Sequence, residues 1–300
     1  PFKSAKAVGK NKTGNRLALA RWMTRSDHPL TARVWVNRVW KHHFGRGIVS
    51  SLDNFGTQGA APTHPGLLDW LSVELVENKW STKHLHHLIC TSRAYRQSSA
   101  KTKLVASKDS DNVLLSRMPM RRLDAEELHD GLLAIAGRLN MRMGGEPDEV
   151  QVFGRGYVTG KPGDEGWRRS VYIRQRRIHT MTLLETFDLP TMNPNCVERV
   201  NSTVVQQPLY LLHDKVIYGL ARQLASQIQK ETKGIEPSIR LAYQKIVNRP
   251  PSKKELASMI ESVGELERQF VEAKETGQRN KALAAVCHAL FNSAAFLYVD

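Results

Sequence analysis

Histidines gather in two short stretches of the sequence, and neighbouring histidines are a common way of holding a metal ion. Residues 35–47 read WVNRVWKHHFGRG and residues 83–96 read KHLHHLICTSRAYR. Side chains at successive helix positions point in different directions, so His42 and His43 cannot easily share one ion. His84 and His87 are three residues apart and are weak candidate metal ligands, but no third ligand of matching context is visible. We therefore expect no metal site.

A second group of residues could bind and turn over an anionic substrate. In the irregular middle of the chain, Asp188 is the candidate acid or base. The candidate binding residues around it are Arg169, Arg174, Arg199 and Asn201. Several cations with one carboxylate would suit a sulfated or uronic sugar. The simpler interpretation, which we favour, is that Asp188 forms a structural ion pair with an arginine.

A polar edge runs along the helix expected over residues 31–44. Arg33 and Asn37 lie one turn apart beside Trp40, and the three could line a pocket. Such side chains more often bond to backbone, so we favour a role in holding a loop. Arg96 is expected on the apolar side of the following helical stretch, where a buried guanidinium would need a partner. The candidate partners are Glu126, Asp130 and Asp69.

The composition is strongly basic. The chain has 300 residues, with 44 Lys and Arg against 29 Asp and Glu, a formal charge of +15. This excess favours polyanionic partners unless the cations are scattered and locally paired. Nucleic-acid binding ranks last, because the basic run at residues 174–177 has no recognised motif beside it. No apolar run approaches the ~20 residues of a membrane helix, and the three cysteines have no CxxC or zinc-type spacing.

Hydrophobic periodicity predicts a mainly α fold, a multi-helix domain with a small β element in the middle. Strand 171–173 could pair with 151–153, and one long helix is expected over 208–229. Helix starts are expected at Pro65 and at the capping boxes of Asp124 with Glu127 and of Ser252 with Glu255, and Gly45 or Gly47 is expected to end the helix that begins near residue 31. We expect a linker at 1–14, an N-terminal helical lobe at 15–145, an irregular segment with short strands at 146–203 and a C-terminal helical lobe at 204–300. The lobes are expected to form one continuous domain.

Ordered blocks of residues carry a resemblance that covers nearly the whole chain. They are Asn37–Trp40 with His42–Gly45, Thr63–Pro65 with Leu67–Leu71, Leu85–His86, Tyr95–Ser99, Arg117–Pro119, Arg121–Leu123, Ala125–Glu126, Arg169–Tyr172, Phe187–Asp188, Ser202–Val204, Gln207, Leu211–Leu212, Asn248–Pro251, Asn292–Ser293 and Phe296–Asp300. This series resembles the planctomycete-specific family called domain of unknown function 1553. His87, His129, Gln206 and His213 depart from its pattern, which makes His87 and His129 poor candidates for a shared catalytic role.

The helical character, the lack of a catalytic motif and the basic surface favour an interaction or scaffold role. The family that the chain resembles has no established activity, so the resemblance leaves open whether the chain is an enzyme. Members of the family are usually C-terminal parts of larger exported proteins, so the resemblance implies that this chain lies outside the cytoplasm. The chain begins at Pro1, and we expect it to be a fragment. The expected partners are upstream domains of the same polypeptide, often cytochrome c-like, and an anionic polysaccharide is the alternative partner. No cofactor is expected in this segment, and the resemblance leaves haem as an option in an upstream domain.

Overall fold

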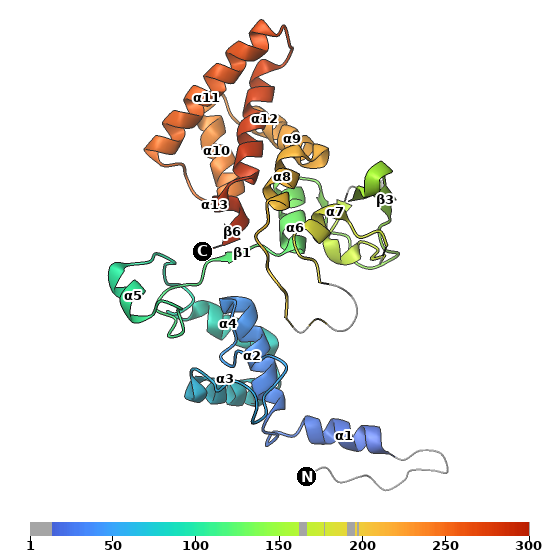
Figure 1. Ribbon diagram of the computed structural model, residues 1–300, viewed down its shortest axis with the longest axis vertical. Helices are drawn as coiled ribbons and strands as arrows, with labels where there is room; N and C mark the ends of the chain where they lie inside the picture. Colours follow the sequence, from blue (N-terminus) through green and yellow to red (C-terminus); the bar gives the residue numbers. More distant parts are fainter. Residues whose placement is uncertain (1–13, 162–166, 177, 191–195, 197, 300) are drawn as a thin grey trace. The chain divides into compact units, whose positions relative to one another are not determined.

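The computed structural model describes residues 14–161, 167–176, 178–190, 196 and 198–299 (Figure 1). Within them the fold is mainly α with small strand pairs, which confirms the predicted class. The helices are α1 (Asn15–Met23), α2 (Thr31–Phe44), α3 (Pro65–Glu77), α4 (Thr82–Thr91), α5 (Lys103–Lys108), α6 (Ala125–Ile135), α7 (Thr182–Thr186), α8 (Gln206–His213), α9 (Lys215–Glu231), α10 (Ile235–Val247), α11 (Lys253–Glu272), α12 (Gln278–Phe291) and α13 (Ala294–Leu297). The strands are β1 (Arg121–Arg122), β2 (Leu139–Asn140), β3 (Val150–Val152), β4 (Val158–Gly160), β5 (Trp167–Arg168) and β6 (Tyr298–Val299).

The chain divides into two compact units, residues 1–121 with Asp300 and residues 122–299. This boundary does not coincide with the division that we expected near residue 145. The reason is α6, whose apolar side packs into the core of the second unit with α7 and α9. The linker expected at residues 1–14 lies almost entirely outside the described residues.

In the first unit, α2, α3 and α4 pack around one apolar core. The core is built from Val36, Phe44, Leu75, Leu85 and Ile89, all at most 2% exposed. Helix α2 ends at Gly45, which adopts a left-handed conformation that glycine tolerates at a helix C-terminus. Pro65 is in the first turn of α3, as predicted from its missing N–H.

In the second unit, α9 and α12 lie against each other, α10 packs onto both, and α11 packs onto α12 and α10 (Figure 1). Capping boxes at Asp124 with Glu127 and at Ser252 with Glu255 begin α6 and α11, which confirms both predictions. The long helix predicted over 208–229 is wrong, because Asp214 is extended and divides it. The Asp214 carboxylate instead accepts from the N–H groups of Val216 and Ile217 and so begins α9.

The predicted pairing of 171–173 with 151–153 is also wrong. Strand β3 pairs with β4, which follows it directly, through a turn that contains Gly156 at φ 79°. Residues Ser170–Tyr172 form a 3₁₀ turn, and Ile173 makes only an isolated bridge with Asp148. A local hairpin closes a shorter loop than the predicted pairing, and so costs less chain entropy. None of the helices described here has the length and apolar character needed to cross a membrane.

Candidate functional site

Asn37 is a fully buried residue that holds a loop of the first unit. Its side-chain amide donates to the carbonyl of Val49 and its carbonyl accepts from the N–H of Val49, both at 2.9 Å. Gly47 is required beside it, because an added Cβ would lie 2.7 Å from Nδ2 of Asn37 and 2.4 Å from the Val49 oxygen. The favoured role of Asn37, holding a loop, is therefore observed.

The other polar candidates of this unit do not gather around Asn37. Arg33 donates to Asp69 and to the carbonyl of Pro29, each at 2.6 Å. Trp40 stacks on Phe44. Trp40 also lines a partly open pocket, but neither Arg33 nor Asn37 reaches that pocket. The other residues that line the pocket are Phe44, Arg46, Gly47, Ile48, Thr63, His64, Asp111, Asn112, Val113, Leu115 and Pro119.

Arg96 is exposed, so the prediction that it faces the core is wrong. Helix α4 ends at Thr91, because Ser92 is extended and its hydroxyl donates to the carbonyl of Ile89. Arg96 lies beyond that end. Of its candidate partners, Asp69 bonds to Arg33 instead.

The histidines form contacts with one another and with a carboxylate. Nε2 of His43 lies 2.7 Å from Nδ1 of His86, while Nδ1 of His43 lies 3.9 Å from the Cys90 sulfur. Since the two contacts use opposite ring nitrogens, they do not converge on one ion. His84 lies 3.3 Å from Glu74, and His87 is exposed. No group of three or more metal-ligand side chains is arranged for an ion within the part of the chain that the structure describes.

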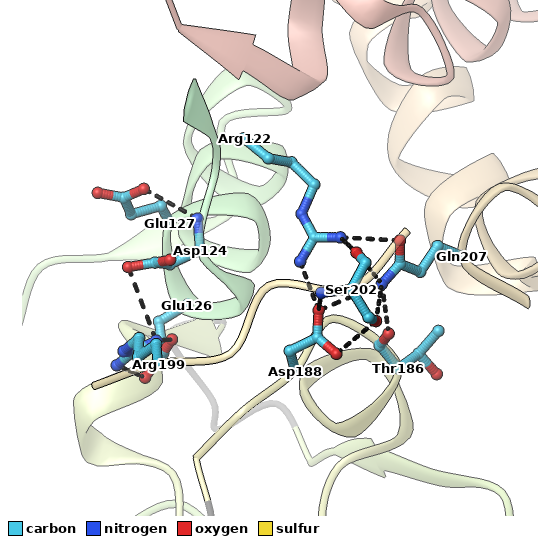
Figure 2. A network of polar contacts seen from close by, with 9 residues as sticks. All are labelled: Arg122, Asp124, Glu126, Glu127, Thr186, Asp188, Arg199, Ser202 and Gln207. Atoms are coloured by element: carbon cyan, nitrogen blue, oxygen red, sulfur yellow. Dashed lines mark hydrogen bonds and ion pairs between the residues drawn. The ribbon is translucent and has the colours of Figure 1, made fainter. Parts of the chain in front are cut away.

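In the second unit, a network of polar side chains surrounds Asp188, at the end of α7 (Figure 2). The backbone of Asp188 is left-handed, with φ 67°, which turns its carboxylate toward three other segments. The carboxylate accepts from Arg122 at 2.7 Å, and from the N–H and hydroxyl of Ser202 at 2.8 and 2.7 Å. Arg122 also donates to the side-chain carbonyl of Gln207 at 2.8 Å and to the Ser202 carbonyl. Gln207 in turn donates to the Thr186 carbonyl at 3.1 Å.

The network makes Asp188 a stable anion. Burial pushes the pKa of Asp188 upward, but the hydrogen bonds from Arg122 and Ser202 together outweigh burial and leave this pKa below its usual value. Arg122 has 8% of its side chain exposed and Asp188 has 20%, so the pair is well shielded from water. The Arg122 guanidinium also lies over the Phe187 ring. A carboxylate held ionised by several donors is a weak acid–base catalyst near neutral pH.

The remaining cation candidates each contact a carboxylate. Arg199 makes a two-bond contact with Glu126, at 2.6 and 2.8 Å, alongside the Asp188 network (Figure 2). This hydrogen bonding is the largest influence on the pKa of Glu126 and lowers it. Arg174 contacts Glu149 at 2.7 Å, and Arg169 lies 3.7 Å from Asp130. Asn201 is exposed. The structure thus brings Asp188 and Arg199 into one region, but it leaves the cations paired.

A Ser–His–Asp cluster that sequence reasoning missed lies beside this region. The Ser170 hydroxyl is 2.9 Å from Nδ1 of His129 and donates to Asp130 at 2.7 Å, while the same Nδ1 lies 3.1 Å from Asp130. A nucleophilic triad needs the serine and the carboxylate on opposite ring nitrogens. Here one nitrogen faces both, and Ser170 is only 3% exposed. The cluster therefore braces the 3₁₀ turn at Ser170–Tyr172 against α6.

Another buried polar contact, between Tyr157 and Asp214, lies where α9 begins. The Tyr157 hydroxyl donates to Asp214 at 2.6 Å. Burial, and then the hydrogen bond to Asp214, raise the pKa of Tyr157 to about 12. Asp214 and Tyr210 line a small pocket with His129, Leu132, Leu133, Thr159, Trp167, Met181, Leu183, Val216, Ile217 and Leu220. The pocket is mostly apolar, and its carboxylate already caps a helix.

Sequence reasoning also missed Arg122, Ser202 and Gln207. Each lies in a block that carries the family resemblance, and so do Asp188 and Glu126. Blocks that are far apart in the sequence therefore meet in one cluster (Figure 2). Membership of these blocks was the signal available in the sequence, although the residue types alone did not indicate which side chains would meet.

Comparison with known proteins supports the resemblance over most of the chain, although the last two blocks, Asn292–Ser293 and Phe296–Asp300, lie outside the matched residues. No match to the chain was found among curated proteins or among solved structures. The family model PSD1, described as a protein of unknown function (DUF1553), matches residues 15–263. The match includes the first unit from α1 onward and every residue of the Asp188 network, and on this basis the chain belongs to the DUF1553 family.

Proposed function

We propose that this chain is a non-catalytic interaction domain, whose buried polar residues hold loops in fixed positions. One observation carries the proposal: the donors around Asp188 are directed at that carboxylate and at neighbouring backbone. A carboxylate that acts as a general acid or base near neutral pH instead has a pKa close to the working pH. The bracing of Val49 by Asn37 supports the same role in the other unit.

The proposed setting is a larger exported protein, in which this domain contacts other domains of the same polypeptide. A cytochrome c-like domain is the proposed neighbour, following the family resemblance. Any haem chemistry then belongs to that neighbour, and the domain described here provides a rigid surface for contact with it. Ordered loops suit this role, because a pre-organised surface loses less conformational entropy on binding.

Catalysis on an anionic polysaccharide is the alternative, with Asp188 as acid or base and Arg169, Arg174, Arg199 and Asn201 as binding residues. No contact described above favours it. Arg174 and Arg199 are paired with Glu149 and Glu126 and would have to exchange these carboxylates for the substrate.

A turnover screen separates the two functions. Purified chain is incubated with sulfated and uronic oligosaccharides, and reducing ends are measured for the wild type and Asp188→Asn. Asparagine tolerates the left-handed backbone at this position, so the variant removes mainly the charge. We expect no turnover by either protein. Turnover by the wild type that disappears in a folded Asp188→Asn chain would overturn the non-catalytic proposal.

A further inference from the structure

The positive charge of the chain is concentrated in one of its two units. Residues 1–121 contain 20 Lys and Arg but only 7 Asp and Glu, whereas residues 122–299 contain 24 against 21. The first unit therefore carries a formal +13 of the total +15. Four of its lysines precede Gly14 and lie outside the described residues.

Within the first unit, α2 and α4 form a face without any acidic side chain of their own. Their sequences, TARVWVNRVWKHHF and TKHLHHLICT, contain no Asp or Glu. The two helices lie side by side, joined by the Trp35 indole donating to the Thr82 hydroxyl at 3.2 Å and by the contact between His43 and His86. The exposed residues on the two helices include Trp35, Arg38, His42, Lys83, His86, His87 and Thr91.

Several arginines of the chain are neutralised by a carboxylate. In the second unit Arg122, Arg174 and Arg199 are paired in this way, and on α2 Arg33 is paired with Asp69. By contrast, Arg38 and Lys83 are exposed and form no ion pair with any described residue. Their charges therefore remain available to an outside anion, and like charges held on neighbouring helices attract a polyanion.

We infer that the α2–α4 face binds a linear sulfated polysaccharide. Sulfate groups stay ionised and pair with Arg38 and Lys83 through charge-assisted hydrogen bonds. Trp35, 46% exposed and fixed by its bond to Thr82, offers a flat apolar surface for a sugar ring. The inference deepens the proposed interaction role by naming a partner, and that role would still stand without it.

Nucleic acid is the competing polyanion, and the composition of the face disfavours it. Base edges in DNA are read mainly by Arg, Lys, Asn and Gln, and the amides of Asn and Gln are the residues that pair with adenine. Neither helix contains Gln, and Asn37 is buried against Val49, so the face offers no exposed amide and only Arg38 and Lys83 as exposed residues of these types. Single-strand binders stack successive bases on several aromatic rings, but the two helices expose one large aromatic side chain, Trp35.

The test measures affinity of the whole chain for a fluorescent heparin oligosaccharide at several salt concentrations. The variant Arg38→Glu/Lys83→Glu alters the face. The matched control Lys253→Glu/Lys254→Glu makes the same change of charge at exposed positions in the second unit. Circular dichroism checks folding, and Arg38→Gln/Lys83→Gln replaces the Glu pair if that variant unfolds.

We expect the face variant to bind at least about tenfold more weakly and to lower the salt slope of log affinity by about 2, one for each lost contact. The control should stay near wild type. Equal weakening in both variants, or no binding by the wild type at low salt, would overturn the inference. So would affinity for a DNA duplex equal to or above that for heparin at matched charge. These outcomes are independent of the Asp188 turnover screen.

Discussion

Replacing Arg122 with methionine tests the structural role of the Asp188 network. The change keeps an unbranched side chain over Phe187 but removes the donors to Asp188, Gln207 and the Ser202 carbonyl. Asp188 would remain as a carboxylate that is only 20% exposed, without its cation. Removing one partner of a buried pair costs about 3–5 kcal/mol, and we expect a loss of this size in the free energy of unfolding of the second unit.

A second substitution, Asp188→Asn, makes the test more specific, because its effect on stability should change sign between the two backgrounds. In the wild-type background, Asp188→Asn leaves Arg122 without its anion and should destabilise by about 1–3 kcal/mol. In the Arg122→Met background, the same Asp188→Asn change removes an uncompensated charge and should increase stability. This reversal is the coupling expected of residues that are in contact or share one hydrogen-bond network.

The assay is urea unfolding at pH 7, with hydrogen exchange measured on peptides from α6 to α9. Exchange is needed because five of the six tryptophans belong to the first unit, so fluorescence reports mainly on that unit. Arg169→Met is the control, because Arg169 is half exposed and its contact with Asp130 is long. A loss below about 1 kcal/mol in Arg122→Met, or no reversal of sign, would refute the reasoning.

Three further predictions use other buried polar contacts. Asn37→Ala leaves both backbone groups of Val49 unpaired and should cost the first unit about 2–4 kcal/mol in urea unfolding; a change within 0.5 kcal/mol, the range of ordinary surface substitutions, would contradict the bracing role. Burial, and then neighbouring cations, lower the pKa of His43. The stability that this gives the first unit should be present above the unfolded pKa of histidine, near 6.5, and should fall as the pH drops below that value. His43→Gln should flatten this pH dependence of stability, and an unchanged slope would contradict the prediction. The raised pKa of Tyr157 predicts a contribution to folding stability that is fully present below pH ~10 and is lost as the pH rises toward 12. Tyr157→Phe should lose the hydrogen bond to Asp214 and so weaken the loss of stability at alkaline pH. Urea unfolding of both proteins at pH 8 and 11 would measure this difference.

The sequence predicted the helices best where a local signal marked their ends. Pro65, Gly45 and the two capping boxes are such signals, because each acts through backbone groups within one turn. The break at Asp214 has the same chemistry, but it lies inside an apolar periodic run that continues into α9. Periodicity alone therefore joined two helices that a capping carboxylate separates.

The candidate site was harder to predict, because long-range contacts decide it. Arg122 and Gln207 are 85 positions apart, and neither residue type distinguishes a brace from a binding group. Asn37 was interpreted correctly because a buried amide most often bonds to backbone. Arg96 was placed wrongly because the helical wheel was extended past Thr91, where the helix has ended.

The central claim, that Asp188 is a structural anion, is tested most directly by its own titration. Carboxyl-carbon NMR of chain labelled at aspartate, assigned by comparison with Asp188→Asn, would follow this one group from pH 3 to 9. Held by Arg122 and Ser202, Asp188 should show a pKa below its ordinary value and no titration above pH 5. A titration of Asp188 between about pH 6 and 8, where a general acid or base would be poised, would contradict the account.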